Sequence, residues 1–230
     1  MYDATYLMQM RCEAVIFDLF GTLVENLRRT EFELMLSHMA RLLSVSEKDF
    51  VRLWNDTWEK RSKGVFSTLE ADIQHLCTLM NAHPDAASIS EAAELAKTFV
   101  RRVLEKPRGT AIQTLTLLKD SGFKTGLISN CAANVPSVWP RTPWARLLDV
   151  PVFSCSVGLK KPDLEIYFLA CRRLQVQPRN SLYVADGNEH ELTGASKAGL
   201  TPILSEDLMR IPTTRGTTVR LGRGPRSLLC

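Results

Sequence analysis

Short apolar runs alternate along most of the chain with segments in which apolar residues recur at helical spacing. Bounded by polar turns and rich in apolar or β-branched residues, the runs predict strands at 14–19, 124–129, 151–154, 181–186 and 201–204. The helical spacing predicts helices between them at 110–122, 164–174 and 191–198. Strands that alternate with helices in this way are typical of an α/β fold with a doubly wound, Rossmann-like parallel sheet.

One long region between the first two strands breaks this alternation. Residues 27–106 contain no convincing strand pattern and show amphipathic helical segments instead. Capping residues or apolar periodicity predict four helices, which begin near Phe32, after Ser46, after Ser67 and at Ser90. The second of these has Phe50, Trp54 and Trp58 at i, i+4 and i+8. We interpret the tryptophans of this helix and the methionines Met35 and Met39 of the first helix, which form an apolar stripe, as the core of a helix bundle.

The insert and the distribution of charge divide the chain into three parts. We expect an α/β core formed by residues 1–24 and 108–210, a helical cap at 25–107, and a basic tail without fixed structure at 211–230. The net charge is +4, but five arginines and no acidic residue lie in 210–230, which leaves a net charge of −1 for the rest. These arginines have no aromatic neighbours that could stack on bases, so we expect no nucleic-acid partner.

The composition fits a globular protein of one or two domains, since 45% of the 230 residues are hydrophobic and 23% are charged. No run of 18 apolar residues predicts a membrane span, and the first residues lack the apolar core of a signal peptide. The six cysteines are scattered without a CxxC pair, which indicates reduced thiols. We therefore expect a cytoplasmic protein without a membrane partner.

Polar side chains stand at the ends of three predicted strands. Asp18 ends the first strand, Ser129 and Asn130 end the second, and Asp186 ends the fourth. Lys161 lies in GLKKPD, before the helix that leads to the fourth strand. Because the carboxyl ends of parallel strands share one edge of the sheet, we expect these groups to converge there. Such a set of two carboxylates, a hydroxyl and an ammonium suits a phosphoryl or acyl-like anion and a metal ion.

Four segments resemble the motifs of the haloacid dehalogenase-like (HAD) hydrolase superfamily: FDLFGTL, LISN, GLKKPD and VADGNEHELTGASKAG. The resemblance covers about residues 13–204, and the helical insert is similar to the small cap that those enzymes place after the first strand. It implies a hydrolase with a HAD-type core and a small anionic substrate. Taken singly, Ser129 and Asp186 are also explained as turn residues and Lys161 as a solvated lysine. Asp18 is harder to explain in this way, because a carboxylate that closes an apolar strand needs a stabilising partner.

The resemblance also implies roles for the residues that match the motifs. Asp18 would be the nucleophile that forms a covalent aspartyl intermediate, Ser129 would hydrogen-bond the transferred group, and Lys161 would neutralise the nucleophile and the developing charge. Substrate oxygens would be held by the backbone N–H groups around Leu19, Phe20 and Asn130.

The family's metal site has matching residues as well. The resemblance implies that Mg²⁺ would be bound by Asp18, the backbone carbonyl of Phe20 and Asp186, with waters completing an oxygen octahedron. Glu191 stands where the family usually has an aspartate. It would reach the ion through water or orient Lys161.

Phe20 is the main departure from the family's phosphatases, which generally have a second aspartate two residues after the nucleophile. That aspartate protonates the leaving oxygen and then activates water, and losing a general acid/base slows a reaction typically by about 10²–10⁴-fold. The family's metal-free dehalogenases have an aromatic residue at this position, since a halide leaves without a proton.

Asn188, which we expect at the substrate, fits the dehalogenase pattern, and so does Tyr167, although simple helix packing also explains Tyr167. Asp186 fits the phosphatase pattern.

Three hypotheses follow. We favour a Mg²⁺-dependent HAD-type phosphatase acting on a small phosphorylated metabolite. The alternatives are a metal-independent 2-haloacid dehalogenase-like hydrolase and a catalytically weak member that binds a ligand or partner. Arg28 and Arg29 are either contacts for an anionic substrate or a solvated pair, and His190 is a weaker alternative for the acid/base. Neither the substrate nor the oligomeric state follows from the sequence.

Overall fold

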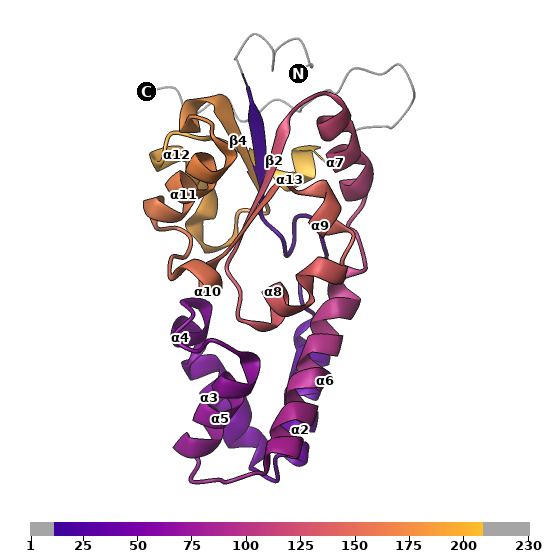
Figure 1. The fold of residues 1–230 in the computed structure, drawn as a ribbon, viewed down its shortest axis with the longest axis vertical. Helices are drawn as coiled ribbons and strands as arrows, with labels where there is room; N and C mark the ends of the chain where they lie inside the picture. The colour runs from indigo at the N-terminus through magenta and orange to yellow at the C-terminus, as the bar shows by residue number, and fades with distance from the viewer. Residues whose placement is uncertain (1–11, 209–230) are drawn as a thin grey trace.

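The computed structural model describes residues 12–208, which form two lobes, one built around a sheet and one entirely helical (Figure 1). The basic tail expected at 211–230 lies outside the described residues. None of the described helices combines the length and the hydropathy needed to span a bilayer.

The sheet has five parallel strands in the order β3-β2-β1-β4-β5. They are β1 (Ala14–Phe17), β2 (Lys124–Ser129), β3 (Val150–Phe153), β4 (Ser181–Ala185) and β5 (Thr201–Leu204). The register places Phe17 beside Leu127 on one side and Val184 on the other. This order confirms the doubly wound sheet, and each predicted strand is present with its ends within two residues of the expected position.

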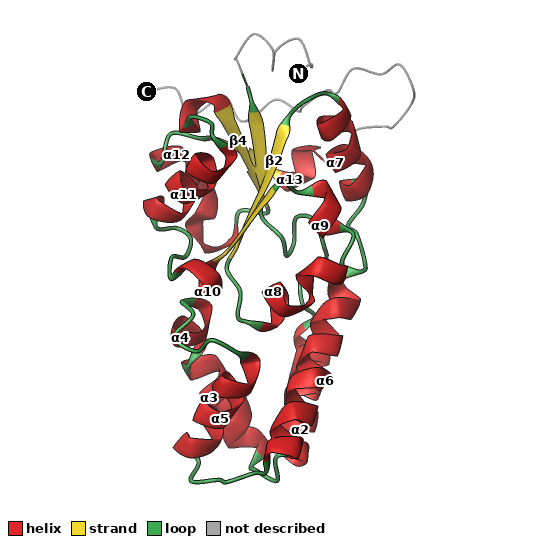
Figure 2. Ribbon diagram, in the orientation of Figure 1, coloured by secondary structure: helices red, strands yellow, loops and turns green. Residues whose placement is uncertain are grey.

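Helices cover both faces of the sheet (Figure 2). One face is covered by α7 (Ala111–Asp120), α8 (Asn134–Val138) and α9 (Trp144–Leu147), and the other by α11 (Leu164–Leu174) and α12 (Glu191–Lys197). Two further short helices, α10 (Ser154–Val157) and α13 (Ser205–Leu208), follow β3 and β5. Successive strand residues point to opposite faces of the sheet. Val15 and Phe17 therefore belong to the hydrophobic cluster with α7, α8 and α9, and Ala14 and Ile16 belong to the cluster with α11 and α12.

The helical lobe comprises α2 (Arg29–Leu42), α3 (Glu47–Asp56), α4 (Trp58–Ser62), α5 (Leu69–Leu79) and α6 (Ala86–Leu104). Its core contains Met35, Met39, Phe50 and Trp54, which confirms the interpretation of the apolar stripe as bundle core. The long helix α6 connects the lobes, since Ala92 packs in this core and Leu104 packs against the sheet.

Three details of the predicted insert were wrong. The side chain that caps α5 belongs to Thr68 rather than Ser67, because its Oγ1 accepts from the N–H of Ala71 at 3.1 Å. Helix α6 begins at Ala86 instead of Ser90, since Asp85 provides the N-cap. Trp58 does not continue the helix of Phe50 and Trp54: α3 ends at Asp56, and Trp58 opens α4. The expected cap at Ser46 is confirmed.

Candidate active site

A cavity of about 610 Å³ lies between the two lobes. Its sheet-side wall includes Asp18, Asn130 and Asp186, which follow β1, β2 and β4. Its other wall comes from the helical lobe and includes Trp54 and Arg61. The carboxyl ends of three adjacent strands therefore open into one cavity, where ligands bind in open α/β sheets.

Lys161 connects two carboxylates at the bottom of this cavity. Its Nζ donates to Asp18 Oδ1 at 2.5 Å, to Glu191 Oε2 at 2.5 Å and to the hydroxyl of Tyr183 at 3.0 Å. All three charged side chains are buried. Burial disfavours the charged form of Lys161, but the two carboxylates together outweigh this and raise its pKa. The solvated-lysine interpretation is therefore wrong.

Burial raises the pKa values of both carboxylates, Asp18 and Glu191. The pKa of Asp18 is raised although Lys161 attracts its charge, and the pKa of Glu191 is raised to about 7. Tyr183 also donates to Glu191 Oε2 at 2.9 Å, so one glutamate oxygen accepts from both Lys161 and Tyr183. This network fixes the position of the ammonium beside Asp18.

The loops after β1 and β2 bring backbone N–H groups to the cavity. Within residues 12–208, the N–H groups of Phe20 and Asn130 have no hydrogen-bond acceptor, whereas the N–H of Leu19 lowers the pKa of Asp18. Gly21 allows this turn, because its φ is +78° and an added Cβ would lie 2.0 Å from Asp186 Oδ2. Free N–H groups at strand ends are suited to bind the oxygens of an anion.

Ser129 is buried, and its hydroxyl has no hydrogen-bond partner in the described part of the chain. An unpaired hydroxyl of this kind is unfavourable unless a ligand supplies the partner. The neighbouring Asn130 positions the lysine segment: its Nδ2 donates to the Lys161 carbonyl at 3.0 Å, and its Oδ1 accepts from the Lys161 N–H at 2.8 Å. Asn130 also donates to Glu189 Oε2 at 2.7 Å.

Three carboxylates provide a candidate metal site. Oxygen atoms of Asp18, Asp186 and Glu191 lie within 4.8 Å of one another. Among the described residues, Lys161 is the one cation that forms ion pairs with this cluster, so the ionised set has a net charge of −2, which fits a divalent cation. The carbonyl of Phe20 accepts no hydrogen bond from residues 12–208, so it is available as a further oxygen ligand. The residues present therefore fit Mg²⁺.

Asparagine side chains hold Asp186. Its Oδ2 accepts from Asn188 Nδ2 at 2.6 Å and from Asn26 Nδ2 at 3.2 Å, and its Oδ1 accepts from the Asn188 N–H at 3.0 Å. Asn188 lines the cavity, where the sequence places it, but its amide is directed to Asp186. Asn26 was not predicted, although its position three residues after the first motif is a signal that could have identified it.

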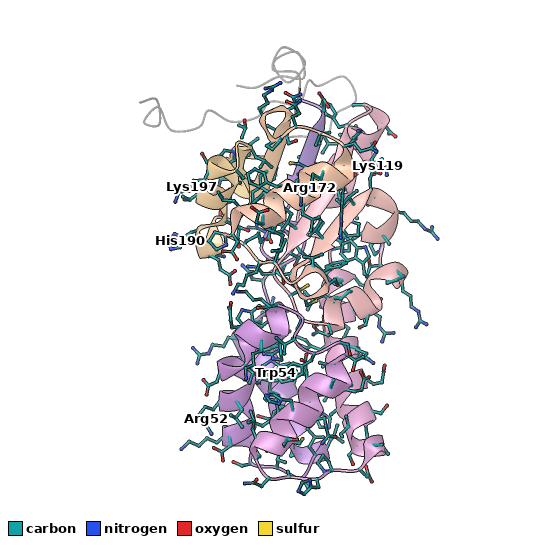
Figure 3. All side chains as sticks on the ribbon, turned by 60° about the vertical axis from the view of Figure 1, so that its left-hand side comes forward. Arg52, Trp54, Lys119, Arg172, His190 and Lys197 are labelled. Atoms are coloured by element: carbon teal, nitrogen blue, oxygen red, sulfur yellow. The ribbon has the colours of Figure 1, made fainter. Side chains whose placement is uncertain are left out.

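Other candidates lie away from the reacting groups. Tyr167 is fully buried and donates to the carbonyl of Glu191 at 2.8 Å, which supports the packing interpretation. Arg28 and Arg29 are exposed and form ion pairs with glutamates of their own helix, as solvated side chains do. His190 is exposed on the outer side of the sheet lobe (Figure 3). The sequence did not identify Tyr183 as a residue of the site. The one signal for it is that an aromatic residue with a hydroxyl group lies inside a buried strand.

Comparisons with known proteins agree with this geometry. A family model for haloacid dehalogenase-like hydrolases matches residues 12–199. A glyceraldehyde 3-phosphate phosphatase of Methanopyrus kandleri is 25% identical over 205 residues, which cover 83% of this chain and 82% of that protein. The (S)-2-haloacid dehalogenase 4A of Burkholderia cepacia is 31% identical over 94 residues, 40% of each protein. A HAD family enzyme of Bacteroides thetaiotaomicron, whose structure was solved with magnesium and inorganic phosphate, has a similar fold, with a TM-score of 0.61 and 15% sequence identity. The superposition covers 84% of this chain and 93% of that enzyme.

Proposed function

This chain belongs to the haloacid dehalogenase-like hydrolase family, and from that premise we propose that it is a Mg²⁺-dependent phosphatase for a small phosphorylated metabolite. The observation that carries the proposal is the buried Lys161 ammonium between Asp18 and Glu191, with Asp186 in the same cluster. Such a site holds a carboxylate nucleophile, a fixed positive charge and an acidic cluster for a cation within one cavity.

The reaction that fits these groups has two phosphoryl transfers. One oxygen of Asp18 attacks the phosphorus, the P–O bond to the alcohol breaks, and the leaving oxygen takes a proton from water because Phe20 has none to give. Water then attacks the phosphorus of the aspartyl phosphate. The P–O bond to Asp18 breaks, which restores the carboxylate and releases phosphate.

The surrounding residues would stabilise the transferred phosphoryl group. Its oxygens would accept hydrogen bonds from the Ser129 hydroxyl and from the N–H groups of Phe20 and Asn130, which have no other acceptor among the described residues. Lys161 would balance the negative charge that builds up on Asp18 and the phosphoryl oxygens. These groups are fixed before the substrate binds, so they need little reorganisation during the reaction.

We propose that Asp18, Asp186 and the Phe20 carbonyl would bind Mg²⁺, with Glu191 contributing through water. When bound, Mg²⁺ supplies positive charge that draws together the substrate phosphate and the Asp18 carboxylate. Two curated relatives named glyceraldehyde 3-phosphate phosphatase, and the structural neighbour solved with magnesium and phosphate, support this choice of chemistry.

The test is the hydrolysis of an activated aryl phosphate, whose leaving group departs without protonation. We expect turnover with Mg²⁺, loss of turnover with excess chelator, and loss in Asp18→Asn. Asp120→Asn, which changes an exposed carboxylate at the end of α7, serves as the matched control and should retain full activity. Turnover that is equal in Asp18→Asn and in the unchanged protein would contradict the proposal.

Phe20 supports a second candidate, hydrolysis of a 2-halo acid, since its ring lines the cavity where a phosphatase would have an acid. In that reaction Asp18 displaces the halide from carbon and forms an ester, and water then attacks the carboxyl carbon of Asp18. Turnover in ¹⁸O-labelled water would therefore label the Asp18 carboxylate. Halide release that persists in chelator, together with this label, would establish the second function in place of the first.

A further inference from the structure

Arg61 is a buried arginine in the wall of the cavity that faces the catalytic cluster. It lies in α4, is only 3% exposed and lines the cavity together with Trp54 and Trp58. Its guanidinium carbon lies 4.1 Å from the centre of the Trp54 ring and 5.5 Å from that of Trp58. In Figure 3, Trp54 lies inside the helical lobe. The two indole rings therefore hold the guanidinium plane at the cavity.

The hydrogen bonds of Arg61 use only one edge of its guanidinium. Nη2 donates to the Trp54 carbonyl at 2.5 Å, and Nε donates to Thr57 Oγ1 at 3.4 Å. Nη1 has no acceptor among the described residues. Arg61 lines the cavity, and Nη2 carries a second hydrogen besides the one donated to the Trp54 carbonyl. The Nη1–Nη2 end of the fork is therefore left for a ligand.

Within residues 12–208, Arg61 forms no ion pair with a carboxylate within 4.0 Å, and Asp72 attracts its charge only from farther away. Burial lowers its pKa to about 10, against this attraction. A desolvated cation at the edge of a cavity is stabilised when an anion binds there.

We propose that Arg61 is a substrate-specificity residue that binds a second anionic group, a carboxylate or phosphate, at the end of the substrate away from the transferred phosphoryl group. This inference rests on the proposed function, and it narrows the substrate class to phosphate monoesters with two anionic ends. The free Nη1–Nη2 end suits such a group because a planar guanidinium binds two oxygens at once. The exposed Arg28 and Arg29 do not provide this, because each is already paired with a glutamate.

A matched series of three-carbon phosphates tests the proposal. Glycerol 3-phosphate has a neutral far end, 3-phosphoglycerate has a carboxylate, and propane-1,3-diol bisphosphate has a second phosphate. We expect kcat/KM to be at least about tenfold higher for at least one of the two compounds with two anionic ends than for glycerol 3-phosphate. The compound with the higher kcat/KM shows whether the second anionic group is a carboxylate or a phosphate.

In Arg61→Gln this preference should fall to no more than about threefold while the value for glycerol 3-phosphate stays the same within about threefold. Arg61→Lys, which keeps the charge but loses the fork, should show an intermediate preference if Arg61→Gln does not fold. Arg52→Gln is the control, since Arg52 is exposed on α3 and paired with Asp49 and Asp56. Equal losses for all three compounds, or an unchanged preference, would overturn the proposal and leave Arg61 with a purely structural role.

A binding measurement separates this inference from the proposed function. Calorimetry with Asp18→Asn should show that 3-phosphoglycerate or the bisphosphate binds at least about tenfold more tightly than glycerol 3-phosphate, and that Arg61→Gln removes the difference. If no phosphate turns over but this difference is found, the proposed reaction fails and the role of Arg61 stands. If turnover occurs without any difference, the role of Arg61 fails alone.

Discussion

Single residues set the chemistry of the cavity, and Phe20 shows this most clearly. It occupies the position at which a phosphatase would have an acid, and its half-buried ring lines the cavity beside Asp18. The Phe20 N–H and carbonyl are both free of partners among the described residues. Under the proposed function, Phe20 would therefore remove proton transfer while preserving the groups that would hold the phosphate and the cation.

Phe20→Asp should restore that proton transfer. We expect the hydrolysis of alkyl phosphates, whose leaving oxygen needs a proton, to rise by about 10²-fold or more. With an aryl phosphate the first step should change little. The measurement is kcat/KM for the two substrate types in both proteins, and a rise of equal size for both types would contradict this explanation.

Asp72 is a residue whose effect should appear in stability. It is buried in α5 without a hydrogen-bond partner in the described residues, and burial raises its pKa from 3.8 to about 7. The folded state therefore holds a proton that the unfolded state has lost, so Asp72 destabilises the fold progressively as the pH rises from about 4 to 7.

Asp72→Asn, which is neutral at every pH, should thus increase the free energy of unfolding by about 2 kcal/mol at pH 8 and by little at pH 4. Denaturant unfolding at the two pH values measures this difference. A stabilisation that is the same at both pH values would show that the carboxyl charge is not the cause.

The sequence predicted some of these residues and not others for a physical reason. Asp18, Ser129 and Asp186 follow strands, and parallel strands bring their carboxyl ends together whatever else the chain does. Arg61 and Asn26 belong to the segments that pack over that edge. Their positions at the cavity depend on how the insert meets the sheet lobe, which residue spacing alone does not determine.

The helices and strands were predicted more accurately than the contacts between them. Apolar periodicity located every strand and the three longest helices of the sheet lobe, α7, α11 and α12, because one face of each must be buried, but it did not predict the short helices α8, α9, α10 and α13. The starts of α5 at Leu69 and of α6 at Ala86 were displaced from the prediction, since several residues near each could serve as the cap. The contact between α4 and α10 had no signal in the sequence.

Gly64 makes that contact possible. It follows α4 with φ of +67°, and an added Cβ would lie 1.8 Å from the carbonyl oxygen of Cys155 in α10. Gly64→Ala should therefore separate the helical lobe from the sheet lobe locally, reduce the free energy of unfolding by about 3 kcal/mol and raise KM.

Gly122→Ala is the control, because Gly122 has φ of +82° with no atom near an added Cβ. It should show only the backbone strain of about 1 kcal/mol and no change in KM. Thermal unfolding and aryl phosphate kinetics compare the two variants. Equal effects in both would mean that the contact with Cys155 is unimportant.

The cavity lies between the hydrophobic core of the helical lobe and that of the sheet lobe. We propose that residues 25–107 form a cap domain over a core made of the flanking segments, and the separate cluster of the helical lobe, which joins the sheet lobe along α6, supports this division. The cavity between them encloses one carboxylate cluster on the sheet side and one free cation, Arg61, on the helical side, within the described residues. This arrangement would bind a small molecule with an anion at each end.

The central claim is that Asp18 accepts a phosphoryl group in a site where Phe20 stands in place of the base for the second step. The most direct measurement is rapid mixing of the protein with an activated aryl phosphate and Mg²⁺, followed by mass spectrometry of the quenched protein. We predict a burst of about one phenolate per site and one phosphoryl group on the peptide that contains Asp18, because without a base at position 20 the second step is the slow one. Linear phenolate release from the first turnover with an unmodified Asp18 peptide would contradict the account.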